Sequence, residues 1–392
     1  MIKRKITPYL LEMSRHFPVI TILGPRQSGK TTLAKELFQN YTYVNLEVKD
    51  AREVAINDPK AFFELYKPPV IIDEVQRVPE LLSTIQVLAD ASKEKGRFIL
   101  TGSHQPKLHE GISQSLAGRT GILKLLPLSI EELADAGISL SRDEYIFNGF
   151  MPRLYDENIP PTMLYPAYSE TYVERDVRQM INVSNQDAFE TFLKLLAGRI
   201  GQVVNLSDLA GDIGISSTTL SSWLSVLEAS YIVFRLPCYF KNFGKRLIKA
   251  PKVFFTDVGL AASLLGIEKV SQVARDPLLG GLFENLVVLE ALKARYNAGK
   301  QQPDLYYFRV QGRNEVDLII DVNRQLIPVE IKAGMTFDPS FANELRKFMD
   351  IATDCINPTV LYSGDTTATI HGIKFDSFRN TAKLFETSNI QV

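Results

Sequence analysis

Cysteine and long apolar runs are scarce in this sequence, and both absences restrict its class. The 392 residues include two cysteines, Cys238 and Cys355, which lie far apart in the chain. This excludes a disulfide framework and a cysteine-based zinc site, and it is typical of a reducing compartment. No run of about 18 apolar residues occurs, and the basic, amphipathic N-terminal segment lacks the unbroken apolar core of a signal peptide. We therefore expect a cytoplasmic protein with no membrane partner.

An excess of positive charge is also missing. The chain has 44 Lys and Arg against 45 Asp and Glu, for a formal net charge of -1. This excludes a polycation that wraps nucleic acid over its whole surface, although a local basic patch is still allowed. The 45% hydrophobic and 23% charged residues are ordinary for a globular protein, and 392 residues predict two to four domains.

Short apolar runs alternate with helical patterns over residues 1–145. Strands of this kind, each followed by a helix, predict a parallel sheet that is covered on both faces. The expected fold class is therefore α/β, with a parallel sheet at the N-terminus; the P-loop NTPase type of this sheet depends on the motif below, and its AAA-plus type is what the family resemblance given below implies. The runs are residues 18–24, 41–46, 70–73, 97–101 and 121–125.

A phosphate-binding motif, GPRQSGKT, follows the first of these strands and opens a helix. Its glycines allow backbone N–H groups to close around phosphates at the positive end of the helix. We expect Lys30 to hold the β- and γ-phosphates of ATP and Thr31 to bind Mg²⁺. The alternative is a chance glycine turn. The predicted nucleotide contacts are Gly24, Pro25, Arg26, Gln27, Ser28, Gly29, Lys30, Thr31 and Thr32.

Two carboxylates end the third predicted strand, in the sequence VIIDE at residues 70–74. Ligands bind at the carboxyl ends of strands in open α/β sheets. We expect Asp73 to hold the Mg²⁺ shell and Glu74 to act as the general base that polarises the attacking water. An acidic turn after a strand is the alternative.

The middle of the chain is predicted to be helical. Residues 146–182 read as a linker or lid, and residues 183–265 as a winged-helix domain whose helix pair is separated by Gly214. The second helix, residues 216–230, has no Lys or Arg and carries an acid, Glu228, so it is a poor lone anchor for DNA. The alternative is a module that packs the ATPase against the C-terminal domain.

A basic run follows that helix pair, and it has two interpretations. It either contacts the DNA backbone as a wing, or it is a solvated loop or a contact to the ATPase domain. The predicted DNA contacts are Lys241, Lys245, Arg246, Lys249 and Lys252.

Residues 275–392 predict a second α/β domain, and three of its residues resemble the core of the PD-(D/E)xK nucleases. Glu330 and Lys332 share one face of a predicted strand, and Asp317 lies on the strand before it. Glu284, on the helix before these strands, matches the helical acid that many such nucleases add. Such a site holds one or two Mg²⁺ ions, so it predicts a second Mg²⁺ site. Cleavage, nucleic-acid binding without cleavage, and an ion pair at a solvated strand edge all stay open.

Eight stretches of the chain, in order, resemble the prokaryotic AAA-plus ATPases with a C-terminal restriction-endonuclease-like domain of unknown function. The resemblance spans nearly the whole chain and implies a three-part layout of ATPase, winged helix and nuclease-like domain. The matching stretches are GPRQSGKTTLAKEL, VIIDEVQRVPELL, FILTGSHQ, LAGRTGILKLLPLSIEEL, YVERDV, KAPKVFFTDVGLAASLLG, FENLVVLEALK and NEVDLIIDVNRQLIPVEIKAG.

The resemblance assigns roles to three more residues. In AAA-plus ATPases a polar residue after the fourth strand senses the γ-phosphate, which implies Thr101 or Ser103, unless these hydroxyls only cap a turn. An arginine before the last strand reaches the nucleotide of a neighbouring subunit, which implies Arg119. A plain surface arginine is the alternative for this residue.

Two functions fit these observations. One is an ATP-dependent enzyme that acts on DNA, in which ATP hydrolysis changes the arrangement of the winged helix and the nuclease-like domain. The other is a regulatory switch whose nucleotide state controls docking to a protein or DNA partner through a nuclease-like domain that does not cleave. Either could assemble as an oligomer.

Overall fold

The computed structural model describes residues 2–103, 112, 114–177, 186–239, 250–310, 314–352 and 354–386, without the side chains of residues 174–177. The chain forms two compact units. The first comprises Met1–Leu128 with two short later segments, Ala229–Tyr231 and Tyr296–Gln301, and the second comprises the remainder. Apart from these two short segments, the chain after Leu128 belongs to the second unit, including α7 (Ile130–Asp135).

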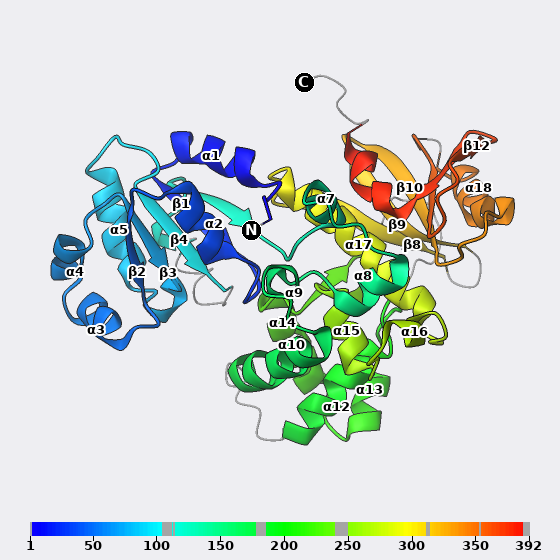
Figure 1. The fold of residues 1–392 in the computed structure, drawn as a ribbon, viewed down its shortest axis with the longest axis horizontal. Coiled ribbons are helices and arrows are strands. Elements are labelled where there is room, and N and C mark those ends of the chain that lie inside the picture. Colours follow the sequence, from blue (N-terminus) through cyan, green and yellow to red (C-terminus); the bar gives the residue numbers. More distant parts are fainter. Residues whose placement is uncertain are drawn as a thin grey trace. The chain divides into compact units, whose positions relative to one another are not determined.

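The first unit is built on a five-stranded, all-parallel sheet with the order β2-β3-β4-β1-β5. All five predicted apolar runs form strands, so the predicted P-loop type of sheet is confirmed; Figure 1 shows it in blue and cyan. The strands are β1 (Val19–Leu23), β2 (Thr42–Asn45), β3 (Val70–Asp73), β4 (Phe98–Gly102) and β5 (Thr120–Lys124).

Each face of this sheet carries its own hydrophobic core because successive strand residues point to opposite faces. Within β3, Val70 and Ile72 pack with α3, α4 and α5, whereas Ile71 packs with α1 and α2. The helices are α1 (Thr7–His16), α2 (Lys30–Leu37), α3 (Lys49–Asn57), α4 (Pro59–Leu65) and α5 (Leu81–Asp90).

The register of the parallel strands gathers the polar residues at one edge. Leu23, the last residue of β1, pairs with Gly102 on one side and Lys124 on the other. Asp73, the last residue of β3, pairs with Asn45. The loop after β1, the acidic end of β3 and the end of β4 therefore share the carboxyl edge of the sheet.

The second unit begins with a helical region. Three helices followed by a strand occupy the predicted winged-helix region, as α12 (Gln186–Ala197), α13 (Leu206–Ile213), α14 (Ser217–Ala229) and β6 (Val233–Leu236). β6 pairs antiparallel with β7 (Lys252–Phe255), which follows the basic run. This order is typical of a winged helix, and that assignment stays a prediction. The other helices are α8 (Arg142–Asn148), α9 (Pro152–Asp156), α10 (Pro161–Tyr168), the π-helical Ser169–Val177, α15 (Val258–Leu264) and α16 (Val270–Val273).

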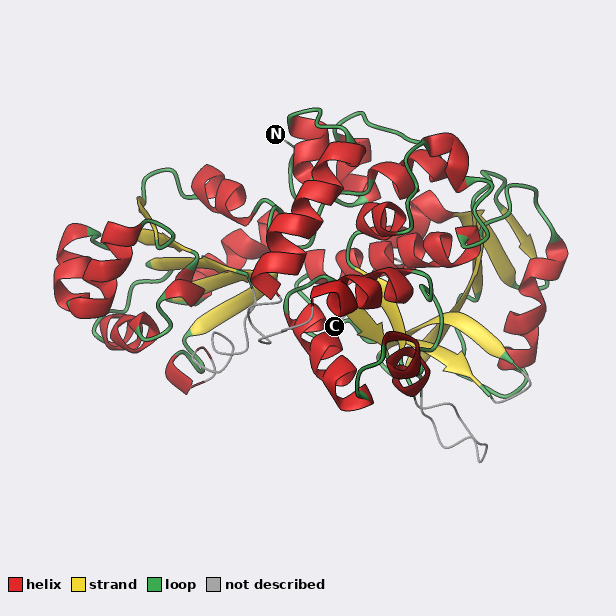
Figure 2. Ribbon diagram, turned by 90° about the horizontal axis from the view of Figure 1, so that it is seen from below, coloured by secondary structure: helices red, strands yellow, loops and turns green. Residues whose placement is uncertain are grey.

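The rest of the second unit is a mixed α/β domain, as predicted. Its six-stranded sheet has the order β12-β13-β11-β10-β9-β8. Figure 2 draws the strands of this sheet, like all other strands, in yellow. β11 pairs parallel with both β10 and β13, and the other pairs are antiparallel. The strands are β8 (Leu305–Arg309), β9 (Glu315–Val322), β10 (Gln325–Lys332), β11 (Thr359–Tyr362), β12 (Ala368–Ile370) and β13 (Ile373–Ser377), and the helices are α17 (Leu279–Asn297), α18 (Asn343–Met349) and the 3-10 segments Pro339–Ala342 and Phe378–Phe385.

α17 is buried around most of its circumference, because apolar residues such as Phe283, Leu286 and Leu289 occur on more than one face. None of the helices among the described residues is both long enough and apolar enough to cross a lipid bilayer. The C-terminal sheet presents Asp317 on β9 and Glu330 and Lys332 on the neighbouring β10, so the predicted nuclease-like residues lie on adjacent strands.

Candidate active site

The loop between β1 and α2 has the backbone that its glycines predict. A Cβ atom on Gly24 would lie 2.1 Å from the carbonyl oxygen of Leu125, so only glycine fits against the end of β5. Gly29 has a φ of 91°, in the left-handed region that favours glycine, and it directly precedes α2. Both glycines are therefore required to bring the loop back onto the N-terminus of the helix.

Arg4 holds this loop from outside the motif. Its side chain is buried, and its guanidinium donates to the carbonyl oxygens of Ser28 at 2.7 Å and Leu126 at 2.6 Å. The charged hydrogen bonds connect the loop to the segment that leaves β5. The sequence analysis missed Arg4, because an arginine in a basic N-terminal segment carries no local signal of this role.

Lys30 is the first residue of α2, and its side chain is 5% exposed. Its ammonium donates to the carbonyl oxygens of Pro25 at 2.6 Å and Gly24 at 3.1 Å, neither of which carries a balancing charge. Burial lowers the pKa of Lys30 to about 8, although Glu74 and Asp73 act in the opposite direction. Phosphate oxygens inside the loop would supply the missing negative charge.

Asp73 is the centre of the polar network at the end of β3. It accepts hydrogen bonds from Thr31 Oγ1 at 2.9 and 3.1 Å, from the Tyr43 hydroxyl at 2.9 Å, and from a close Thr101 Oγ1. Burial and the Asp73 carboxylate raise the pKa of Tyr43, which keeps this phenol protonated as a donor. Tyr43 lies on the neighbouring strand and was not among the predicted site residues.

The residues present fit Mg²⁺. A hydroxyl oxygen of Thr31 and a carboxylate of Asp73 meet within hydrogen-bond distance, and these are the oxygen ligands that Mg²⁺ takes beside a phosphate. They lie next to the buried ammonium of Lys30 at the start of a helix, so one edge collects the groups that a Mg²⁺-nucleotide requires.

Glu74 has a constrained position directly after this strand. Its backbone has a φ of 58°, and its backbone N–H donates to Thr101 Oγ1 at 3.4 Å. The Gln76 amide contacts a Glu74 carboxylate oxygen closely and also donates to Ser103 Oγ at 2.9 Å. The two predicted sensor hydroxyls therefore lie in the same network as the predicted base, and Gln76 is an additional member that the sequence analysis did not identify.

Three buried polar atoms at this edge have no hydrogen-bond partner among the described residues. They are Gln27 Oε1, Ser28 Oγ and Gln76 Oε1. An unpartnered buried polar group is costly, so such groups call for a ligand or water. Their presence in the loop and beside Glu74 is consistent with a site that is completed by nucleotide and water.

The remaining predicted nucleotide contacts lie at the rim of the loop. Arg26 forms an ion pair with Glu47 at 3.3 Å, and Glu47 also pairs with Arg77 at 2.7 Å. Thr32 is exposed on the first turn of α2, and Pro25 contributes its carbonyl to Lys30. Arg26 is partly buried and Arg77 is exposed, and the two arginines form a positive border beside the phosphate loop.

Arg119 lies at the opposite edge of the sheet. Its carbonyl accepts from the backbone N–H of Val19, at the start of β1, and Val19 is roughly 17 Å along the strand from Gly24. Its guanidinium pairs with Asp90 at 2.6 and 2.9 Å. Arg119 therefore does not reach the phosphate loop of its own chain, and the predicted action on a neighbouring subunit stays a prediction.

A second polar cluster lies in the C-terminal domain. Lys252 Nζ is 2.7 Å from carboxylate oxygens of both Glu284 and Glu315, and 4.0 Å from Asp317. Arg309 also pairs with Glu315 at 3.2 Å. The structure thus brings the predicted residues Glu284 and Asp317 together around a lysine ammonium.

Glu330 and Lys332 form the other half of this cluster. Lys332 Nζ lies 2.5 Å from Glu330 Oε1, and the backbone N–H of Ile331 donates to Asp317 Oδ2 at 2.9 Å. Glu330 Oε2 is buried without a partner among the described residues. Burial and the nearby Asp317 raise the pKa of Glu330 to about 9, and Lys332 offsets part of this effect.

The position of Lys252 corrects one predicted DNA contact. Its side chain is only 1% exposed and is enclosed by carboxylates, so it cannot reach a phosphate backbone. The reason is that β7 turns this residue inward, toward α17 and β9. The other predicted DNA contacts, Lys241, Lys245, Arg246 and Lys249, lie outside the described residues.

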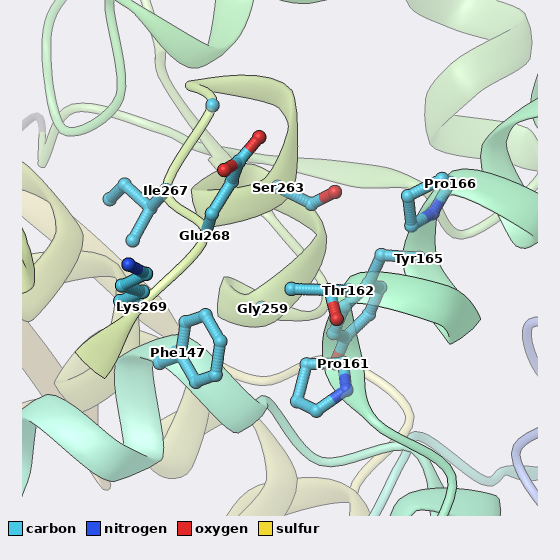
Figure 3. Close-up of a pocket in the computed structure, with 11 residues that line it drawn as sticks. Phe147, Pro161, Thr162, Tyr165, Pro166, Gly259, Ser263, Ile267, Glu268 and Lys269 are labelled. Atoms are coloured by element: carbon cyan, nitrogen blue, oxygen red, sulfur yellow. The ribbon is translucent and has the colours of Figure 1, made fainter.

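A cavity of about 370 Å³ lies apart from both clusters, in the helical part of the second unit. Figure 3 shows its lining, which comes from α8, α10, α15 and the loop before α16. Phe147 and Pro161 give it an apolar side, and Glu268 and Lys269 add one charge of each sign. Opposite charges do not select one sign of ligand, so this lining defines no ligand class.

Three family models match separate parts of the chain. Residues 16–134 match a model described as an AAA domain, residues 140–271 match a domain of unknown function (DUF8612), and residues 279–378 match another domain of unknown function (DUF4143). The first match contains the phosphate loop and the acidic end of β3. The third contains the whole carboxylate cluster except Lys252.

The chain is also similar to two curated mycobacterial proteins. It is 29% identical over 370 residues to uncharacterized protein Rv2008c of Mycobacterium tuberculosis, which covers 93% of this chain and 81% of the relative. The values for uncharacterized protein Mb2031c of Mycobacterium bovis are the same.

Among solved structures, the Walker-type ATPase PABY2304 of Pyrococcus abyssi matches with 13% identity and a TM-score of 0.40, covering 66% of this chain and 94% of that one. A RuvB variant of Thermotoga maritima matches with 20% identity and a TM-score of 0.28, covering 59% and 88%. At this level of similarity neither structure transfers a function to this chain. The AAA-domain match, the parallel sheet and the phosphate loop agree, so the N-terminal part of this chain is an AAA-type P-loop domain, and matches to two domains of unknown function follow it.

Proposed function

We propose that residues 24–31, Asp73 and Glu74 bind MgATP and hydrolyse the bond between its β- and γ-phosphates. The observation that carries this proposal is the hydrogen bond from Thr31 to Asp73, at 2.9 Å, beside the buried ammonium of Lys30. The hydroxyl and the ammonium at the start of α2, together with the carboxylate at the end of β3, are the groups that phosphoryl transfer requires.

The loop binds the phosphates in this proposal. Backbone N–H groups at the start of α2 and the ammonium of Lys30 hold the phosphate oxygens, and the positive end of the helix adds to their effect. Thr31 and Asp73 hold the Mg²⁺ ion, which neutralises charge on the phosphates when bound.

Glu74 carries the hydrolytic step. Its carboxylate accepts a proton from the attacking water, and its backbone conformation and the Gln76 amide fix its direction. Ser103, which shares the Gln76 amide, and Thr101, which contacts Asp73, respond to the presence of the γ-phosphate. The chain thereby gains two states that differ in the polar network at the end of β3 and β4.

The experiment is a phosphate-release assay with two variants. Lys30→Ala should lose nucleotide binding and hydrolysis together. Glu74→Gln keeps the size and polarity of the side chain but removes the base, so it should bind ATP and lose turnover. A Glu74→Gln variant that hydrolyses at the wild-type rate would remove Glu74 from this role.

The nucleotide state is proposed to control the C-terminal region, and two versions differ in the partner. In the first, that region binds or processes DNA, which the basic run at residues 241–252 suggested. In the second, it is a docking module that does not cleave. Two observations favour the second: α14 carries no Lys or Arg, and Lys252 is enclosed by carboxylates.

ATP hydrolysis measured with and without single- and double-stranded DNA separates these versions. Stimulation by DNA that disappears in Glu74→Gln supports the DNA-acting version. Metal-dependent nicking that disappears in Lys332→Ala or Asp317→Ala supports cleavage. Slow turnover that DNA does not change supports the docking module.

A further inference from the structure

Lys252 enters the carboxylate cluster from another part of the fold. It is the first residue of β7, whereas Glu284 lies on α17 and Glu315 and Asp317 lie on β9. Its ammonium is equally close, at 2.7 Å, to Glu284 Oε1 and Glu315 Oε1. Burial alone would lower the pKa of Lys252, but the three surrounding carboxylates raise it above its usual range, so the amine stays charged.

The cluster has little remaining space for another cation. A Cβ atom on Gly201 would lie 2.8 Å from Glu284 Oε2, so backbone closes that side of the carboxylate. Asp317 Oδ2 is occupied by the backbone N–H of Ile331, and Glu330 Oε1 is occupied by Lys332. A divalent cation needs several carboxylate oxygens within about 2.0–2.6 Å. Glu284 Oε1, Asp317 Oδ2 and Glu330 Oε1 already have donors, and Glu330 Oε2 is the buried oxygen that has none among the described residues.

The cations that the cluster already contains lead to the same conclusion. The four carboxylates are Glu284, Glu315, Asp317 and Glu330, and their cationic partners are Lys252, Lys332 and Arg309. Within the described part of the chain, no group of three or more His, Cys, Asp or Glu side chains is arranged to hold a metal ion. The predicted second Mg²⁺ site therefore does not fit the residues as they stand.

We propose that the ammonium of Lys252 is the resident cation of this cluster and takes the place of a divalent metal. The C-terminal domain then binds no metal and carries out no metal-dependent cleavage. Instead the cluster is a set of buried ion pairs that joins β7 to α17 and β9. A buried charge without its partner is strongly unfavourable, so these ion pairs stabilise the fold only while the lysine is present.

The first arm of the test uses the chain with Lys252 intact. The substitution Asp73→Asn removes the carboxylate of the ATP site, and no nucleotide is added. Mn²⁺ is then titrated and followed by electron paramagnetic resonance. No saturable Mn²⁺ site is expected at millimolar metal. A bound Mn²⁺ that disappears on Asp317→Asn would overturn the proposal, and this arm does not require any substitution of Lys252 to fold.

The second arm replaces the cation in the same Asp73→Asn chain. Lys252→Met keeps the side-chain length but removes the charge, so a saturable Mn²⁺ site should appear and Mn²⁺ should raise the Tm of this variant. The matched control is Lys293→Met, because Lys293 is equally buried on α17 and pairs with Glu290 at 2.7 Å, outside this cluster. Its Tm should not respond to Mn²⁺.

A folded Lys252→Met chain that gains no metal site, or one whose response equals that of Lys293→Met, contradicts the proposal. If Lys252→Met does not fold, Lys252→Met with Glu284→Gln lowers the repulsion and should fold without metal. Because nucleotide is absent throughout, the outcome is independent of whether the chain hydrolyses ATP.

Discussion

Lys30 carries an ammonium that is buried before any nucleotide arrives. Its hydrogen bonds go to two carbonyl oxygens, and burial lowers its pKa to about 8. Only the protonated amine attracts phosphate, so the free chain loses its binding-competent form as the pH rises through 8. Nucleotide stabilises the charged form and must therefore draw a proton onto the chain at alkaline pH.

The affinity for ATP is thus expected to weaken between pH 7 and pH 9.5, and binding at pH 8.5 should take up a proton. Isothermal titration calorimetry in two buffers of different ionisation enthalpy measures that proton directly. The Lys30→Arg variant, whose cation does not titrate in this range, is the control and should show no uptake. Equal uptake by both proteins would assign the proton to another group.

Gln76 connects the predicted base to the end of β4, since its amide contacts both Glu74 and Ser103. Its own oxygen is buried without a partner among the described residues, which indicates a position for water or nucleotide. Gln76 is therefore a positioning residue for Glu74 and not itself a base.

The variant Gln76→Ala should lower kcat by roughly 10- to 100-fold, a part of the effect of a general base, while the KM for ATP changes little. Steady-state kinetics separates the two constants. Gln39→Ala, at an exposed glutamine that bonds only its own chain segment, is the matched control. A loss confined to KM would show that Gln76 binds nucleotide instead.

At the scale of elements, the stability of the C-terminal strands and of α17 depends on pH. Burial and Asp317 raise the pKa of Glu330 on β10 to about 9, and burial raises the pKa of Glu284 on α17 to about 8. In the unfolded chain both carboxyls lose their protons near pH 4.5. Between these values the folded state binds more protons than the unfolded state, so stability falls as the pH rises.

Thermal unfolding of the second unit should therefore shift to lower temperature between pH 6 and pH 9. The substitution Glu330→Gln removes the titrating group and should make this shift smaller. Differential scanning calorimetry at several pH values measures both effects. A Glu330→Gln chain with the full wild-type slope would show that other groups cause the dependence.

The sequence predicts the elements and the local motifs well, because both depend on neighbouring residues. All five parallel strands of the first unit follow from short apolar runs, and the phosphate loop follows from its glycines. Arg4 and Tyr43 could not be predicted, since their partners are distant in sequence and meet only after packing. The same limit applies to Lys252. Its position in a basic run predicts an exposed side chain, and its burial depends on β7, which turns it inward.

At the scale of the whole molecule, the role of Arg119 depends on assembly. The residue lies at the amino edge of its own sheet and pairs with Asp90. If it serves the nucleotide of a neighbouring subunit, the chain must associate to become fully active. The guanidinium of Arg119 would then leave Asp90 and contact a phosphate at the interface.

The ATPase rate per subunit should accordingly rise with protein concentration, and Arg119→Ala should abolish the rise. Light scattering over the same concentrations reports assembly, which separates a chain already fully assembled from one that does not associate. The Asp90→Asn variant is a useful comparison, because it frees the guanidinium without removing it. A rate that stays constant while the chains associate would exclude action between subunits.

The most direct test of the central claim is phosphate release from MgATP by three proteins at equal concentration. Wild-type chain should turn over, Lys30→Ala should neither bind nor turn over, and Glu74→Gln should bind ATP while losing at least about 100-fold in rate. A wild-type chain that takes up no nucleotide at millimolar concentration, or two variants that hydrolyse at its rate, would contradict the assignment of this site.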